Sequence, residues 1–157
     1  MRYNDIAEND YYKECLKKTG EYEKNRKFCR HDIKHFFDVA RIAYIIALEE
    51  NMDINKDIIY AAAILHDIGR YKEYENGISH EKASADIAKR ILSECGYNEE
   101  DKEMIINAIL AHRGEKKREG LSEILYRADK LSRDCVRCDA KEECYWNDDK
   151  KNKEIVY

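Results

Sequence analysis

The apolar run from Ala61 to Leu65, followed at once by His66 and Asp67, constrains the fold of this chain most. Five consecutive small or aliphatic residues predict a buried helix, and Gly69 supplies a helix-stop signal just beyond it. The imidazole and the carboxylate therefore leave the end of a buried helix together. Burying both groups is costly unless a partner satisfies them, and a metal ion is the simplest partner.

The composition favours a helical protein. The chain has no proline and only six glycines, which favours long helices joined by short loops. Charged residues make up 39% and hydrophobic residues 43%, values that are ordinary for a folded protein and not for a disordered one. A length of 157 residues suits one sizeable core. We therefore predict a single all-α domain over residues 1–157.

Charge and hydropathy narrow the possible partners. The formal net charge is −4, with lysines and arginines scattered along the chain. This argues against a broad nucleic-acid face but permits a local phosphate pocket. The N-terminus lacks a signal-peptide pattern, and no apolar stretch reaches membrane-spanning length. We expect a cytoplasmic protein that binds neither membranes nor polymeric nucleic acid, and the oligomeric state stays open.

Hydrophobic periodicity predicts where the helices lie. Residues 4–27 have helical composition with a break near Gly20, whereas residues 71–79 are expected to form a polar loop. Ser79 is expected to cap the helix that follows this loop. The stronger helices are predicted at residues 32–50, 56–66, 80–96, 98–112 and 121–134.

Candidate metal ligands fall on the apolar faces of these five helices. A single histidine on such a face is usually a hydrogen-bonded core residue. Here each of the five helices presents one candidate, and a further aspartate lies beside one of them. Burying several imidazoles and two carboxylates in one small domain would be costly without a shared cation. The predicted metal ligands are His35, His66, Asp67, His80, His112 and Asp129.

The order of these residues resembles the HD superfamily of metal-dependent phosphohydrolases. The shared pattern is His35, then His66 with Asp67, then Asp129 in the sequence ADKL, and it covers roughly residues 31–133. The resemblance implies an HD-type helical bundle of about six to seven helices. It also implies that these four residues bind a first metal ion. Residues 135–157 would form a cysteine-containing C-terminal segment beyond the family core.

The remaining two histidines bear on the number of metal ions. His80 and His112 match the additional histidines of HD subgroups with two metals, including the HD-GYP phosphodiesterases and the HD-type diadenosine tetraphosphate hydrolases. In such a site Asp67 would bridge the ions. The Gly-Tyr-Pro signature is absent, which disfavours cleavage of cyclic di-GMP. Imidazole with carboxylate suits iron, manganese, cobalt or zinc, so we expect one or two such divalent ions.

Several other side chains are candidates for catalysis. Asp67 could accept a proton from an activated water. Arg70 resembles the basic residue in the His-Asp-x-Gly-Lys pattern of related enzymes, and Lys130 follows Asp129 directly, so both are candidates to hold phosphate. For each cation the alternative is a solvated surface charge. His31 could act as an acid or base in the pocket, or it could cap the helix start. Further phosphate-binding candidates are Arg133, Arg113 and Lys72.

The cysteines suggest a second site. Cys135, Cys138 and Cys144 form a C-x2-C-x5-C pattern. If the helices that carry His35 and Asp129 run antiparallel, Cys29 approaches Cys135 at the same end of the bundle. Four thiolates indicate a structural zinc site or an iron-sulfur cluster. The alternative is reduced, unpaired cysteines in a surface loop.

The functional expectation follows from the ligands and the cations together. The resemblance implies metal-dependent hydrolysis of a phosphoester or phosphoanhydride bond in a small phosphorylated metabolite, with a nucleotide as the favoured class. The alternative is a redox- or nucleotide-responsive regulatory module that binds without turnover, and the cysteine pattern is what supports it. A purely structural metal is the third possibility.

Overall fold

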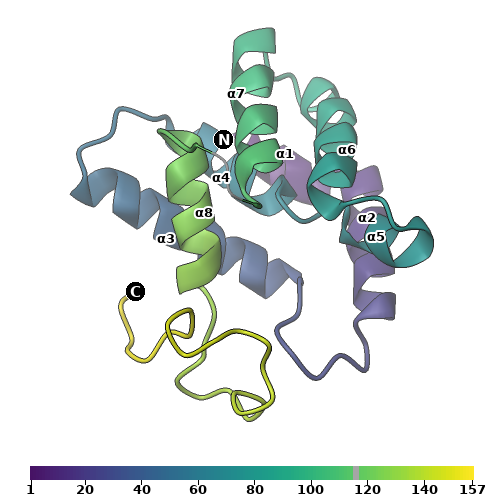
Figure 1. Ribbon diagram of the computed structural model, residues 1–157. Coiled ribbons are helices and arrows are strands. Elements are labelled where there is room, and N and C mark those ends of the chain that lie inside the picture. The colour runs from purple at the N-terminus through teal and green to yellow at the C-terminus, as the bar shows by residue number, and fades with distance from the viewer. Residues whose placement is uncertain (115–116) are drawn as a thin grey trace.

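The chain forms an all-α structure, as predicted (Figure 1). The computed structural model describes residues 1–114 and 117–157, and over these residues it contains eight helices, against the six to seven expected. No helix in this part of the chain is both long and apolar enough to cross a bilayer. The helices are α1 (Tyr3–Glu8), α2 (Asp10–Tyr22), α3 (Ile33–Glu49), α4 (Lys56–Leu65), α5 (Arg70–Asn76), α6 (His80–Glu94), α7 (Glu99–Ala111) and α8 (Leu121–Leu131).

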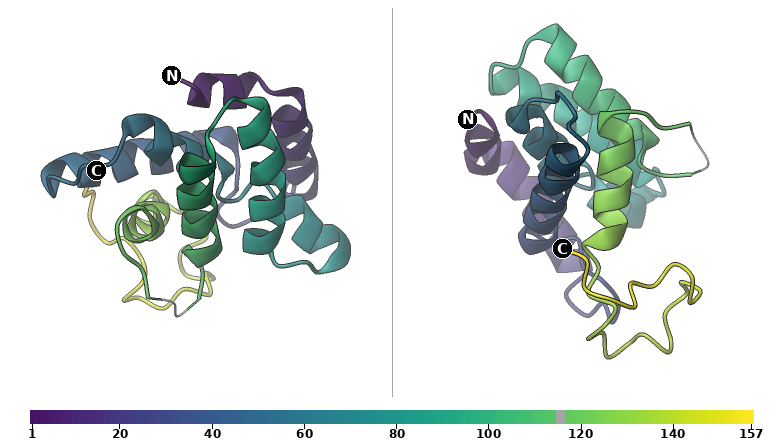
Figure 2. Two further views of the ribbon diagram at one scale, coloured as in Figure 1. Left: turned by 90° about the horizontal axis from the view of Figure 1, so that it is seen from above. Right: turned by 90° about the vertical axis from the view of Figure 1, so that its left-hand side faces the viewer.

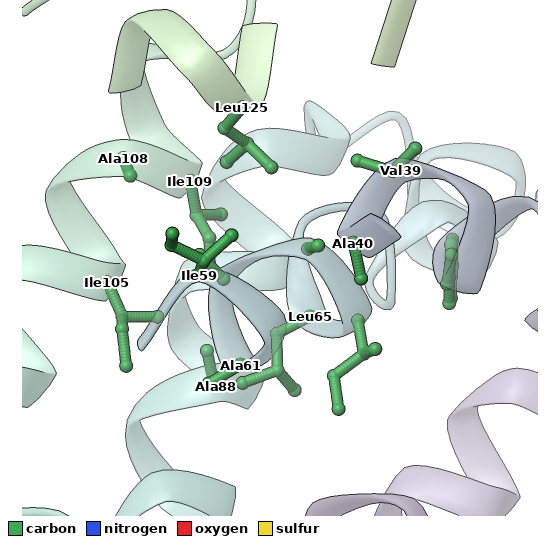
Figure 3. Close-up of a cluster of buried hydrophobic side chains, with 14 of the residues drawn as sticks. Val39, Ala40, Ile59, Ala61, Leu65, Ala88, Ile105, Ala108, Ile109 and Leu125 are labelled. Carbon is green, nitrogen blue, oxygen red and sulfur yellow. The ribbon is translucent and has the colours of Figure 1, made fainter. Parts of the chain in front are cut away.

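Helix α4 is the centre of the core. Its residues from Ala61 to Leu65 are fully or almost fully buried, and it packs against α1, α3, α6, α7 and α8. A helix that is apolar on all sides is stable only when other elements surround it. Figure 3 shows Ile59 and Leu65 of α4 among side chains from α3, α6, α7 and α8. His66 and Asp67, which follow the C-terminal end of α4, therefore lie in the interior, as the apolar run predicted.

The N-terminal helices divide at a different residue from the one expected. The break lies at Asn9, whose side chain accepts a hydrogen bond of 3.0 Å from the backbone N–H of Tyr12 and so begins α2. Asparagine is a strong N-cap because its side chain satisfies an otherwise free N–H group. Gly20 lies inside α2, so the prediction of a break there was wrong.

The predicted loop at residues 71–79 was also wrong, because most of it forms the short helix α5. This helix ends at Gly77, whose φ of 70° is the left-handed conformation that glycine adopts without strain. Ser79 precedes α6, but its side chain makes no capping hydrogen bond. The main helices lie close to the predicted ranges, except that α8 ends at Leu131 and not at residue 134.

Gly69 serves close packing and not helix termination. Its φ is −87°, which any residue can adopt. A Cβ atom at this position would lie 2.3 Å from the backbone nitrogen of Ser84 and 2.5 Å from the carbonyl carbon of Ala83. The Gly69 N–H also donates to the Ser84 hydroxyl at 2.9 Å. The turn after α4 therefore touches the backbone of α6, which sets the position of the residues on both.

The C-terminal segment, residues 133–157, contains no helix or strand and folds back beside α3 and α8 (Figures 1 and 2). The side-chain amide of Asn152 donates to the carbonyl oxygens of Lys130 at 2.9 Å and Arg133 at 2.7 Å, at the end of α8. The Tyr157 hydroxyl donates to Glu49 on α3 at 3.0 Å. The last residues of the segment are thus held against α8 and α3.

Candidate metal centre

The first predicted ligand group comes together from three helices. His35 on α3, His66 and Asp67 after α4, and Asp129 on α8 are buried, and one ligand atom of each lies within 4.8 Å of the others. Nε2 of His35 is 3.4 Å from Oδ1 of Asp129, and Nε2 of His66 is 3.4 Å from Oδ2 of Asp67. These separations are long for hydrogen bonds. Two atoms that share one ion at about 2.0–2.2 Å lie roughly 3–3.5 Å apart, so the spacing fits a metal ion.

The second group shares a carboxylate with the first. Oδ1 of Asp67 lies 3.4 Å from Nε2 of His80 on α6 and 3.5 Å from Nε2 of His112 after α7. The other oxygen of Asp67 faces His66 in the first group. The structure therefore brings all six predicted ligands together, with Asp67 between the two groups.

Backbone carbonyls orient two of the imidazoles. Nδ1 of His66 lies 2.6 Å from the carbonyl oxygen of Ala63, and Nδ1 of His112 lies 2.5 Å from that of Ile109. Each ring donates its Nδ1–H to a carbonyl three residues earlier. This keeps the lone pair on Nε2, the nitrogen that faces the carboxylates. Each ring is therefore oriented by a backbone carbonyl of the chain just before it, with Nε2 free to bind a metal ion.

A side chain that the sequence analysis did not identify orients His80. Glu73 lies on α5, and its Oε2 accepts a hydrogen bond of 2.8 Å from Nδ1 of His80. A carboxylate behind a histidine ligand fixes the ring and increases its basicity. Glu73 also lies 3.3 Å from Arg70 and 3.4 Å from Arg113. The i, i+3 spacing of Arg70 and Glu73 was a helical signal at the start of the segment predicted as loop.

Unpartnered buried atoms test whether the residues fit a cation. Nε2 of His35, Nε2 of His66 and Oδ1 of Asp67 are buried and have no hydrogen-bond partner. Such atoms are costly unless something binds them. Burial tends to raise the pKa of Asp67, but His66 and His112 hold it well below its usual range. A charged carboxylate beside free imidazole lone pairs is a donor set that fits divalent metal ions.

The predicted phosphate-binding cations lie beside these groups. Arg70 and Lys130 line a cavity of about 230 Å³ together with Asp67 and Asp129. Arg70 pairs with Glu73 behind His80, and Nζ of Lys130 is 2.5 Å from Oδ2 of Asp129. Of the weaker candidates, Arg113 and Arg133 line the cavity, and Lys72 does not.

His31 is buried at the wall of the same cavity and does not cap α3. The cap of α3 is Asp32, whose side chain accepts from the backbone N–H of His35 at 2.9 Å. Nδ1 of His31 is 2.6 Å from Oε1 of Glu23, and its Nε2 is 3.6 Å from Oδ2 of Asp67. The geometry therefore favours the pocket role over the capping role. Glu23 follows the end of α2, where no periodicity indicated its importance.

The four predicted cysteines line this cavity as well: Cys29, Cys135, Cys138 and Cys144. They do not form a compact ligand group, because no three of these described sulfur atoms lie within 4.8 Å of one another.

Comparison with known proteins identifies the family. The HD domain model matches residues 32–134, and the chain belongs to this family. An uncharacterized protein of Clostridium beijerinckii is 52% identical over 156 residues, which cover 99% of each chain. Ribonuclease Y of Mycoplasma mycoides subsp. mycoides is 33% identical over 125 residues, which cover 79% of this chain and 23% of the ribonuclease.

A solved structure agrees with the family. A predicted HD superfamily hydrolase from an uncultured Thermotogales bacterium matches with a TM-score of 0.68 and 25% identity, over 90% of this chain and 79% of that one. The HD family and the two ligand groups together indicate that this chain binds a divalent metal.

Proposed function

We propose that this chain is a metal-dependent phosphohydrolase that cleaves a phosphoester or phosphoanhydride bond in a small phosphorylated metabolite, with a nucleotide as the favoured class. The observation that carries the proposal is that one cavity contains Asp67 and Asp129 of the ligand groups beside several cations. Of the proteins that this chain resembles, the solved structure is named a predicted HD superfamily hydrolase, and the Mycoplasma relative is named ribonuclease Y.

The charge of the cavity suits phosphate. Seven lysines and arginines line it against three aspartates, although the whole chain carries a net charge of −4. Positive charge concentrated in a recess attracts anions and pairs with phosphate oxygens. The cations are Arg26, Arg70, Arg113, Lys130, Arg133, Lys141 and Lys151.

Aromatic side chains favour a nucleotide over a simple phosphate ester. Phe28, Tyr145 and Trp146 line the cavity, and the Trp146 ring lies 5.9 Å from Nζ of Lys130. Aromatic faces stack on nucleobases, and this contact is worth about 1–3 kcal/mol per base. An aromatic face beside a phosphate-binding cation matches the two ends of a nucleoside phosphate.

We assign separate roles in hydrolysis to the metal ligands, the cations and His31. When bound by the two ligand groups, divalent ions would supply Lewis-acid activation of water and of the phosphoryl group. Arg70 and Lys130 would hold the phosphate oxygens. Both oxygens of Asp67 face histidines of the ligand groups, so we assign proton movement to Nε2 of His31 and not to Asp67.

The test is a screen for turnover with metal-loaded protein. Nucleoside mono-, di- and triphosphates, diadenosine tetraphosphate and a short RNA would be incubated with Mn²⁺ or Fe²⁺, and products separated by chromatography. We expect cleavage of a small nucleotide that Asp67→Asn abolishes and Asp86→Asn, an exposed change on α6, retains. Preferential cleavage of the RNA would contradict the small-metabolite substrate.

The same screen separates the enzyme from the regulatory alternative. A binding module would bind a nucleotide tightly by calorimetry and convert none of the compounds with any metal. In that case Asp67→Asn would have no turnover to remove. The cysteines that line the cavity are the observation that favours this alternative.

A further inference from the structure

We propose that Cys29, Cys135, Cys138 and Cys144 bind a second metal centre through their thiolates, and that this centre fastens the C-terminal segment beside the HD site. These residues are separate from the histidine and aspartate groups, so the inference does not rest on the proposed hydrolysis.

The fold brings the two cysteine-bearing segments together. Helices α3 and α8 pack against each other, and the chain before α3 and the chain after α8 lie at the same end of the structure (Figure 1). Nη1 of Arg133 donates to the carbonyl oxygen of Arg30 at 3.1 Å, and Lys27 pairs with Glu143 at 2.5 Å. These two contacts join residues on either side of Cys29 to the segment that carries the other three cysteines.

The three C-terminal cysteines lie near Cys29. All of them line the same cavity. Burial raises the pKa of the Cys29 thiol, Arg133 opposes this effect, and Cys135, Cys138 and Cys144 each raise the pKa further. The influence of three thiols on the fourth requires that they lie near it. The other two cysteines of the chain lie elsewhere: Cys15 is buried against Tyr71, and Cys95 ends α6.

The C-terminal segment lacks the usual means of holding its shape. Residues 133–157 contain a single buried residue, Ala140, and no regular secondary structure. Ordering a segment costs conformational entropy, which small units without a hydrophobic core offset with disulfides or metal ions. Because a thiolate-bound metal contributes its binding free energy to folding, it would supply the stabilisation that apolar burial does not.

The spacing of the sulfur atoms favours an iron-sulfur cluster over zinc. Four thiolates on one zinc ion at about 2.3 Å lie less than about 4 Å apart. Here no three of the four described sulfur atoms lie within 4.8 Å of one another, whereas the histidine and aspartate atoms meet that limit in two groups. A cluster places each thiolate on a different corner or iron, so it accepts more widely spaced ligands.

The first experiment measures iron, zinc and acid-labile sulfide per chain after purification without oxygen or chelator. The wild type, the double variant Cys135→Ser with Cys138→Ser, and the matched control Cys95→Ser would be compared. We expect sulfide and its iron to disappear only in the double variant, which retains the metal of the histidine groups and its helical circular dichroism. One zinc per chain lost in the double variant would overturn the cluster but retain the thiolate centre. Sulfide and metal contents that do not change in the double variant would overturn the centre.

A second measurement on the wild type remains decisive if the variant fails to fold. Thiol alkylation followed by peptide mapping would be carried out before and after metal removal. We expect the four cysteines to be protected in the metal-loaded protein and labelled after removal, with Cys95 equally labelled in both. Equal labelling of the four before and after removal, or a disulfide between Cys135 and Cys138 in the freshly purified protein, would contradict the proposal. Neither measurement involves turnover, so failure of the proposed hydrolysis would leave this result unaffected.

Discussion

Oε1 of Glu23 lies 2.6 Å from Nδ1 of His31, and both side chains are almost completely buried. The same carboxylate accepts the backbone N–H of His31 at 2.7 Å and the hydroxyl of Tyr74 at 2.7 Å. On the opposite side of the ring, Nε2 lies 3.6 Å from Asp67. Glu23 is therefore a positioning residue, because it fixes the direction in which His31 faces the candidate metal centre.

We predict that Glu23→Gln removes stability at neutral pH but not in acid. Burial tends to raise the pKa of Glu23, but its contacts with His31 and Tyr74 lower it from 4.5 to about 2. A lowered folded-state pKa stabilises the protein above the unfolded-state pKa, and this contribution is lost as the pH falls through the folded-state value. The difference is on the order of 3 kcal/mol.

Urea unfolding of wild type and Glu23→Gln at several pH values measures this effect. The gap in unfolding free energy should be largest above about pH 5 and shrink towards about pH 2. The exposed neighbour Glu21 provides a control. Glu21→Gln should show no such gap, although acid would remove bound metal from this variant to the same extent as from the wild type. A gap that is constant with pH would mean that Glu23 contributes packing and not charge.

The shared position of Asp67 predicts unequal metal losses. Asp67→Asn should reduce the occupancy of both ligand groups, because each oxygen of Asp67 faces a different group. His35→Ala should reduce only the first group and His80→Ala only the second. Elemental analysis after dialysis gives the metal per chain, with Asp86→Asn as control. Loss of all metal in His80→Ala would show that the two groups cannot be filled separately.

Arg70 is predicted to bind phosphate through its planar guanidinium. Arg70→Lys keeps the charge but loses the paired N–H donors, so we expect the Kd for the preferred nucleotide to rise about tenfold, or about 1.4 kcal/mol. Lys72→Met, two residues along α5 and outside the cavity, should leave the Kd unchanged. Calorimetry measures both whether or not the nucleotide is cleaved. An equal Kd for wild type and Arg70→Lys would place the phosphate elsewhere.

The clustering of the candidate ligands was predictable because helical periodicity decides which residues share a buried face. His35, His80 and His112 each recur with apolar residues at helical spacing, so their inward direction followed from the sequence alone. The end of α4 required only the apolar run before His66. The resemblance to the HD superfamily added the order in which the ligands occur.

The supporting residues were not predictable in the same way. Glu23 reaches His31 across an irregular connection, and Glu73 lies on a helix of seven residues whose polar composition resembles a loop. Their roles depend on how α2, α5 and α6 pack together, which no local pattern encodes. The position of Cys29 could be inferred only because α3 and α8 carry facing ligands and therefore fix which chain ends meet.

The sequence suggested that Gly69 stops a helix, but its role in the structure is close packing against α6. Gly69→Ala would place a Cβ atom 2.3 Å from the backbone nitrogen of Ser84, so α6 must shift away from the turn that carries Asp67. We expect a loss of about 3 kcal/mol in unfolding free energy, since backbone atoms cannot rotate aside. At Gly20 an added Cβ atom would meet nothing within 4 Å beyond its own helix backbone, so Gly20→Ala should instead stabilise α2 by about 0.5–1 kcal/mol. Urea unfolding compares the two, and metal analysis of Gly69→Ala should show weaker binding at His80. Wild-type stability in Gly69→Ala would mean that α6 does not approach this turn so closely, and the position of the second ligand group would then need another cause.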